Sequence, residues 1–83
     1  MKINTTNIEG VYLIEPKLFK DNRGVFFESF NKEIFKKNIA SSINFVQDNQ
    51  SSSSKGVLRG LHFQKPPHAQ AKLVSVVKGT VLD

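Results

Sequence analysis

Short strand-like segments separated by turns constrain the fold of this sequence more than any other feature. The segments rich in β-branched and aromatic residues are 11–14, 25–30, 43–47, 56–64, 73–77 and 80–82. Turn-forming residues lie between them, namely Pro16, the stretch 20–24, the serine run 51–54, the pair Pro66-Pro67, and Gly79. This spacing predicts an all-β sandwich or barrel.

One short helix is expected between the second and third segments. Its signals are an N-cap, an acidic first turn and a basic last turn, supplied by Asn31, Glu33 and Lys36-Lys37. Phe35 and Ile39 stand four residues apart, so they form an apolar stripe one turn long. Ser41 and Ser42 are expected to end the helix.

The composition is that of a globular protein. The chain has 83 residues, of which 39% are hydrophobic and 23% charged, so we expect one domain at most. It contains no cysteine, which rules out a thiolate metal site within it and fits a reducing cytoplasm. No apolar run has the length of a signal peptide or a membrane span.

The net charge of +5 permits three interpretations. Ten lysines and two arginines are scattered along the chain, which is typical of solvated surface positions. A nucleic-acid-binding protein would instead gather basic residues and exposed aromatic rings on one sheet face. A mildly basic pocket for an anionic small ligand, such as a nucleotide, fits the same charge.

The segment 56–64 carries the most specific chemistry, because it sets Arg59 and His62 inside an apolar stretch. Side chains alternate along a strand, so the two would face opposite sides unless Gly60 forms a bulge. His62 is then either a general base near neutral pH or a hydrogen-bonded structural histidine. His62 and His68 lack a third ligand in a metal-binding pattern, so no metal site is predicted.

The remaining candidates are polar side chains beside turns and strand ends: Arg23, Glu28, Gln47, Asp48, Asn49 and Lys72. Taken singly, each has a structural explanation, as a surface ion pair, a loop cap or a solvated lysine. The sequence contains no Gly-rich phosphate loop, dinucleotide fingerprint or nucleophile elbow.

Together these residues form a recognisable pattern. The matching motifs are Gly10-Val11 with Ile14-Glu15-Pro16, DNRG at 21–24, FESFN at 27–31, FVQDN at 45–49 and SSKGVLRGLHFQ at 53–64, followed by Pro66-Pro67, Gln70, 72–74 and Gly79. On these motifs the chain resembles the N-terminal part of the dTDP-4-dehydrorhamnose 3,5-epimerase family. The resemblance implies a cupin-like jelly roll, a homodimer, a cytoplasmic location, and no metal or cofactor.

The resemblance also implies a reaction and residue roles. The substrate would be a dTDP-linked 4-keto-6-deoxyhexose, inverted at C3 and C5 by proton abstraction and reprotonation on the way to dTDP-L-rhamnose. His62 would be the base, Lys72 would stabilise the enolate oxygen, and Arg59 would contact the diphosphate. The nucleotide and sugar contacts would be Arg23, Glu28, Gln47, Asp48 and Asn49, with Arg23 and Glu28 acting across the dimer.

Two departures from the family qualify this expectation. Gln50 stands where a histidine is common, and the family's chains run to about twice this length. The tyrosine acid and the aspartate that orients the base lie beyond Asp83 in the family. Residues 1–83 are therefore expected to be the N-terminal portion of one jelly-roll domain, ending within a strand and inactive alone. The alternatives are a dTDP-sugar-binding fragment without turnover, and a related epimerase that inverts one centre or uses another dTDP-sugar.

Overall fold

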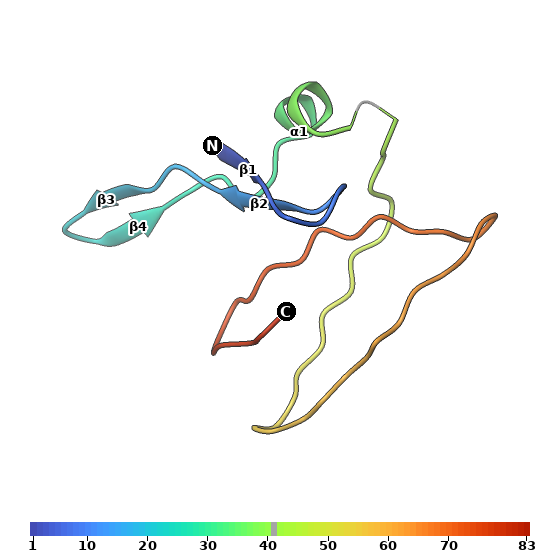
Figure 1. Cartoon of the computed structure of the whole chain (residues 1–83). Coiled ribbons are helices and arrows are strands. Elements are labelled where there is room, and N and C mark those ends of the chain that lie inside the picture. The colour runs from blue at the N-terminus through green and yellow to red at the C-terminus, as the bar shows by residue number, and fades with distance from the viewer. Residues whose placement is uncertain (41) are drawn as a thin grey trace. The chain divides into compact units, whose positions relative to one another are not determined.

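The residues that the computed structural model describes form four strands and one short helix (Figure 1). It describes residues 1–40 and 42–83. The elements run in the order β1 (Lys2–Thr5), β2 (Tyr12–Glu15), β3 (Phe19–Asp21), β4 (Gly24–Phe26) and α1 (Lys32–Asn38). The predicted class, strands with one short helix, is thus confirmed at this coarse level. The chain divides into two compact units, Met1–Asn44 and Phe45–Asp83, and each is considered by itself.

β1 and β2 form an antiparallel pair in which Lys2 lies opposite Glu15 and Thr5 opposite Tyr12. Ile3 and Ile14 face each other across the pair and are both half-buried, so this cross-strand contact stabilises the register. The connection turns at Gly10, whose φ of +82° lies in the left-handed region that favours glycine. A backbone hydrogen bond from the Val11 N–H to the Ile8 carbonyl, at 3.1 Å, closes the turn.

β3 and β4 form a second antiparallel hairpin, with Phe19 opposite Phe26 and Asp21 opposite Gly24 (Figure 1). The turn between them was predicted from the sequence and is confirmed. The Asp21 Oδ1 atom accepts a hydrogen bond from the Arg23 N–H at 2.8 Å, the local bond by which aspartate favours tight turns. The paired rings of Phe19 and Phe26 lie 6.4 Å apart between centroids.

The helix α1 begins as the sequence predicts, and it ends at Asn38 with Ile39 as its C-cap. The Asn31 side chain accepts a hydrogen bond from the Ile34 N–H at 3.1 Å, which satisfies one of the free N–H groups of the first turn. Glu33 lies in the first turn, and the last turn is basic, so both complement the helix dipole. The predicted break at Ser41 and Ser42 falls partly on Ser41, outside the described residues.

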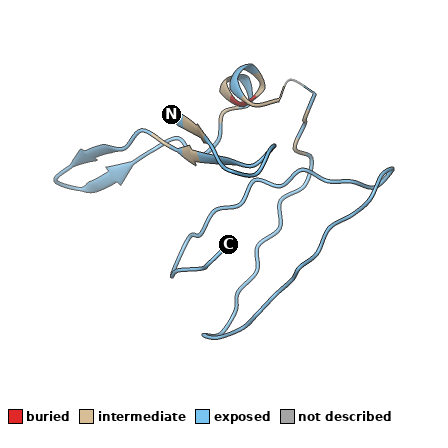
Figure 2. Ribbon diagram, viewed as in Figure 1, coloured by how far each residue is buried: buried red, intermediate tan, exposed pale blue. Residues whose placement is uncertain are grey.

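The apolar core among the described residues is small. Phe35, in α1, is the one buried hydrophobic side chain among them, at 8% exposure, and buried colour appears in Figure 2 on that helix. Its ring centroid lies 5.9 Å from that of Phe30. In the second unit Phe45 is half-buried and the other residues are exposed. Packing therefore holds α1 in place, and loop hydrogen bonds dominate the second unit.

The strands predicted at 43–47, 56–64, 73–77 and 80–82 are absent from the described residues, so those predictions are wrong for this structure. A strand needs a neighbour in register to pair with its backbone N–H and C=O groups. The backbone hydrogen bonds of the second unit close two turns instead, from Val57 to Ser54 at 3.3 Å and from His68 to Lys65 at 2.9 Å. The composition of these segments favours an extended backbone, but in the described residues no second segment pairs with them to form a hydrogen-bonded ladder.

In the first unit the predicted strand bounds needed correction. The strand expected over 25–30 is limited to β4, Gly24–Phe26, because its partner β3 begins at Phe19, and Pro16 further back cannot donate to a ladder. β1 and β3 were not predicted. Each is short and holds a lysine beside a residue that is depleted in strands, Asn4 in β1 and Asp21 in β3, which weakens the strand signal.

Candidate substrate-binding site

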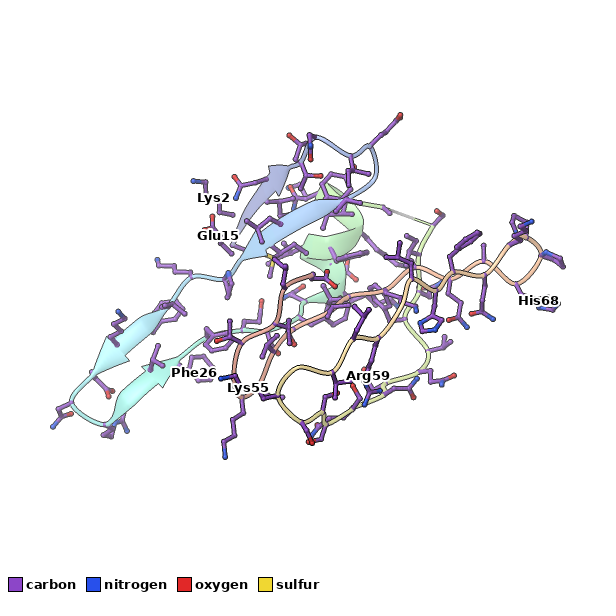
Figure 3. The ribbon with its side chains drawn as sticks, turned by 60° about the horizontal axis from the view of Figure 1, so that its bottom comes forward. Lys2, Glu15, Phe26, Lys55, Arg59 and His68 are labelled. Atoms are coloured by element: carbon purple, nitrogen blue, oxygen red, sulfur yellow. The ribbon has the colours of Figure 1, made fainter. Side chains whose placement is uncertain are left out.

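Arg59, labelled in Figure 3, is held by two hydrogen bonds from its guanidinium. Its Nε atom donates to the Ser53 hydroxyl oxygen at 2.9 Å, and its Nη2 atom donates to the Ser52 carbonyl oxygen at 3.1 Å. The turn at 54–57 folds the chain back so that these residues meet, and Gly56 adopts a φ of +84° in it. Local chain reversal, not a sheet, therefore fixes this guanidinium.

The partners of Arg59 are neutral, so they orient its charge without cancelling it. Across the described residues, no carboxylate forms an ion pair with this guanidinium. An arginine carries five N–H donors, and the contacts to Ser52 and Ser53 use two of them. The remaining donors and the full positive charge are suited to an anionic group such as a phosphate.

Arg23 differs from Arg59 because a carboxylate holds it. Its Nη2 and Nε atoms lie 2.6 Å and 3.1 Å from the Asp21 Oδ2 atom. This side-chain hydrogen bond, together with the one from the Arg23 backbone N–H, lowers the pKa of Asp21 below its ordinary value of 3.8. The Arg23 guanidinium stays 86% exposed, so the pair fixes its orientation in solvent and offsets part of its charge.

Gln47 and Asn49 are brought together by the structure. The Gln47 Nε2 atom donates to the Asn49 Oδ1 atom at 3.1 Å, and Asp48 lies exposed between them. Two linked amides retain one free acceptor oxygen and one free amide group, which can hydrogen-bond a polar ligand. The predicted cluster of polar side chains at 47–49 is therefore present, although it lies on an irregular segment and not at a strand end.

His62, Lys72 and Glu28 are all exposed. No hydrogen bond or ion pair within the described chain joins His62 to Lys72 or to Arg59. The bulge predicted at Gly60 requires a ladder that residues 56–64 do not form, but the backbone does turn there, with a φ of +114°. Side-chain hydrogen bonds thus fix the two arginines and the Gln47–Asn49 pair. The described residues show no such hydrogen bond or ion pair that would fix the His62 side chain.

The described residues contain no group of three or more His, Cys, Asp or Glu side chains placed to hold a metal ion. They also contain no helix with the length and apolar character needed to cross a membrane. His68 lies at a turn of the second unit well away from Arg59 (Figure 3).

Comparison with known proteins identifies the family. The family profile described as dTDP-4-dehydrorhamnose 3,5-epimerase matches residues 5–83. The chain belongs to this family. It is 52% identical over all 83 residues to the dTDP-4-dehydrorhamnose 3,5-epimerase of Shigella flexneri and covers 46% of that protein. The enzymes of the same name from Escherichia coli K12 and Methanothermobacter thermautotrophicus are 51% and 49% identical, over 100% and 94% of this chain and 45% and 41% of their own lengths.

The chain therefore spans less than half the length of these dTDP-4-dehydrorhamnose 3,5-epimerases. The resemblance stated from the motifs is confirmed, and it extends over nearly the whole sequence.

Sequence reasoning missed the residues that hold the two arginines, which are Asp21 for Arg23 and, in the other unit, Ser52 and Ser53 for Arg59. An aspartate two positions before an arginine in a tight turn is a signal that could have found the first pair. The serine run was interpreted as a loop only. The serine run and Arg59 lie on either side of the Lys55-Gly56 turn, and this placement is the signal that was overlooked.

Proposed function

We propose that this chain acts in the reaction of a dTDP-4-dehydrorhamnose 3,5-epimerase. Its substrate is dTDP-4-dehydro-6-deoxy-D-glucose, whose C3 and C5 centres are inverted on the way to dTDP-L-rhamnose. The observation that supports this proposal most strongly is the 52% identity to an enzyme of that name over the full 83 residues. The local geometry of the arginines adds a physical reason to expect an anionic, nucleotide-linked ligand.

The chemistry is acid–base catalysis beside a ketone. C3 and C5 flank the C4 carbonyl, so removal of either proton gives an enolate whose charge rests on the C4 oxygen. His62 is the proposed base, since the unprotonated nitrogen of a neutral imidazole can accept a proton. Lys72 is proposed to stabilise the enolate oxygen by its positive charge.

Arg59 is proposed to bind the diphosphate, because its uncancelled charge and free donors match phosphate oxygens. The proposed nucleotide and sugar contacts are Arg23, Glu28, Gln47, Asp48 and Asn49. The hydrogen bonds from Arg23 to Asp21 and from Gln47 to Asn49 would order three of these side chains, Arg23, Gln47 and Asn49, before the ligand arrives. No metal or cofactor is part of the proposal, because the chemistry transfers protons alone.

The wider architecture is also proposed from the family. Residues 1–83 would form the N-terminal portion of a single cupin-like jelly-roll domain that acts as a homodimer in the cytoplasm. The segments with strand-like composition at 43–47, 56–64 and 73–77 would then pair with neighbouring segments of the jelly roll. This pairing would supply the ladder that His62 and Lys72 lack among the described residues.

A base without an opposing acid has a defined chemical outcome. His62 can remove a proton, exchange it with solvent, and return a solvent hydron to the same face. Inversion additionally needs an acid on the opposite face, and the family's tyrosine for that role lies beyond position 83. We therefore expect residues 1–83 by themselves to be inactive as an epimerase, and the one partial reaction that their proposed base could still support is slow solvent exchange at C3 with retention of configuration.

The test combines binding and exchange with the 83-residue chain. Calorimetric titration should detect dTDP, and NMR in deuterated solvent should detect loss of the C3 proton of dTDP-4-dehydro-6-deoxyglucose. His62→Ala should lower the exchange rate about 100-fold or more while dTDP still binds, and His68→Ala is the matched control that should retain exchange. Binding without exchange in the wild-type chain would favour a non-catalytic dTDP-sugar-binding role, and absence of both would refute the proposal.

A further inference from the structure

The Arg59 guanidinium is bound along one edge only. The Nε atom contacts the Ser53 hydroxyl at 2.9 Å, and Nη2 contacts the Ser52 carbonyl at 3.1 Å. Both contacts use the Nε and Nη2 side of the guanidinium. The Nη1 atom and the second Nη2 hydrogen are left, and they form the fork that binds two oxygens of one phosphate.

We propose that Ser53 is a positioning residue for diphosphate binding, acting through Arg59. This inference rests on the proposed function, because it assumes that Arg59 meets the diphosphate of a dTDP-sugar. The Ser53 hydroxyl holds the Nε edge so that the outer fork faces the ligand. An arginine loses much rotamer freedom when it is ordered, so a side chain ordered in advance binds its anion more tightly.

Because Ser53 is uncharged, its hydrogen bond to Arg59 affects the expected affinity for the diphosphate differently from an ion pair. A carboxylate in the place of Ser53 would also orient the guanidinium, but it would offset the charge that attracts the diphosphate. Asp21 does this to Arg23 in the other unit. Ser53 gives the orientation without the compensating charge, so Arg59 retains its full attraction for a polyanion.

Within the serine run, only Ser53 contributes a side-chain contact to Arg59. Ser52 contributes its backbone carbonyl, and the carbonyl of Ser54 accepts the turn hydrogen bond from Val57. Substitution of these two serines by alanine preserves both carbonyls. Ser51 makes neither contact, so Ser51→Ala is a matched control of identical chemistry two residues away.

The experiment compares dTDP with thymidine, which lacks the diphosphate, by calorimetric titration of the 83-residue chain. Ser53→Ala should weaken dTDP binding about threefold to tenfold, the effect of one lost hydrogen bond, and leave thymidine binding unchanged. Ser53→Thr keeps the hydroxyl and should restore dTDP affinity, while Ser51→Ala should match the wild type. In an Arg59→Ala background, Ser53→Ala should have no further effect.

Different failures have different meanings. Equal dTDP affinities for Ser53→Ala and Ser51→Ala would overturn the positioning role alone, as would an effect that persists without Arg59. Equal loss of dTDP and thymidine binding would show that Ser53 is structural, which also overturns it. If the wild-type chain binds no dTDP, the proposed function fails and this inference fails with it.

Discussion

Substitution of Phe35 by alanine should remove the main packing interaction of the first unit. Phe35 is 8% exposed and is the one buried hydrophobic side chain among the described residues. Phenylalanine-to-alanine changes in protein cores cost about 3–5 kcal/mol. The neighbours of Phe35 are only half-buried or exposed and can relax into the space, so we expect the lower end, about 3 kcal/mol.

A loss of this size should melt α1. The helix Lys32–Asn38 has seven residues, and isolated helices shorter than about 12 residues are marginal in water. Its remaining support is local, from the Asn31 cap and the charges of its terminal turns. Removing the Phe35 ring also removes its contact with Phe30, a ring pair at 5.9 Å that contributes about 1 kcal/mol of the total.

The assay is residue-specific. Cα chemical shifts of residues 32–38 report helix content, and a urea titration followed by the same signals reports stability. Phe26→Ala is the matched control, because Phe26 is also paired with a ring, that of Phe19, but is 71% exposed and should cost about 1 kcal/mol or less. Retained helical shifts in Phe35→Ala, or a larger loss in Phe26→Ala, would refute the reasoning.

Three further outcomes follow from individual contacts. Asn31→Ala should destabilise α1 by about 1 kcal/mol in the same urea titration and Asn31→Ser should restore it, because serine also caps. The Asp21 pKa is lowered in the folded chain, so its pairing with Arg23 should contribute to stability at all pH values above about 4 and be lost as pH falls through the lowered pKa. Carboxyl NMR titration should show that pKa rising toward 3.8 in Arg23→Ala, and an unchanged value would contradict the assigned cause. Arg59→Ala should weaken dTDP binding about tenfold or more in calorimetry, as expected for the loss of hydrogen bonds to a charged group. Wild-type affinity in this variant would refute the proposed contact between Arg59 and the diphosphate.

Elements governed by short-range chemistry were predictable from the sequence. The cap of α1 was placed correctly because Asn31 bonds an N–H three residues away, and the β3–β4 turn because Asp21 bonds an N–H two residues away. The segments at 43–47 and 56–64 failed as strands for the opposite reason. Their composition indicates an extended backbone, but a ladder depends on a partner distant in sequence, which composition does not specify.

The candidate site residues show the same difference between contacts that are close in sequence and contacts that need pairing of distant segments. The contact of Arg59 with Ser53 spans six residues and is closed by one turn, so it forms without any sheet. The placement of His62 opposite Lys72 would depend on pairing between two segments that form no ladder here. The proposed anion binding and the proposed proton transfer would therefore have separate structural requirements. Ser53→Ala should lower dTDP affinity without changing the exchange rate at saturating substrate, because its contact with Arg59 needs no sheet. The exchange rate should instead depend on the backbone pairing of residues 56–64, which carry His62.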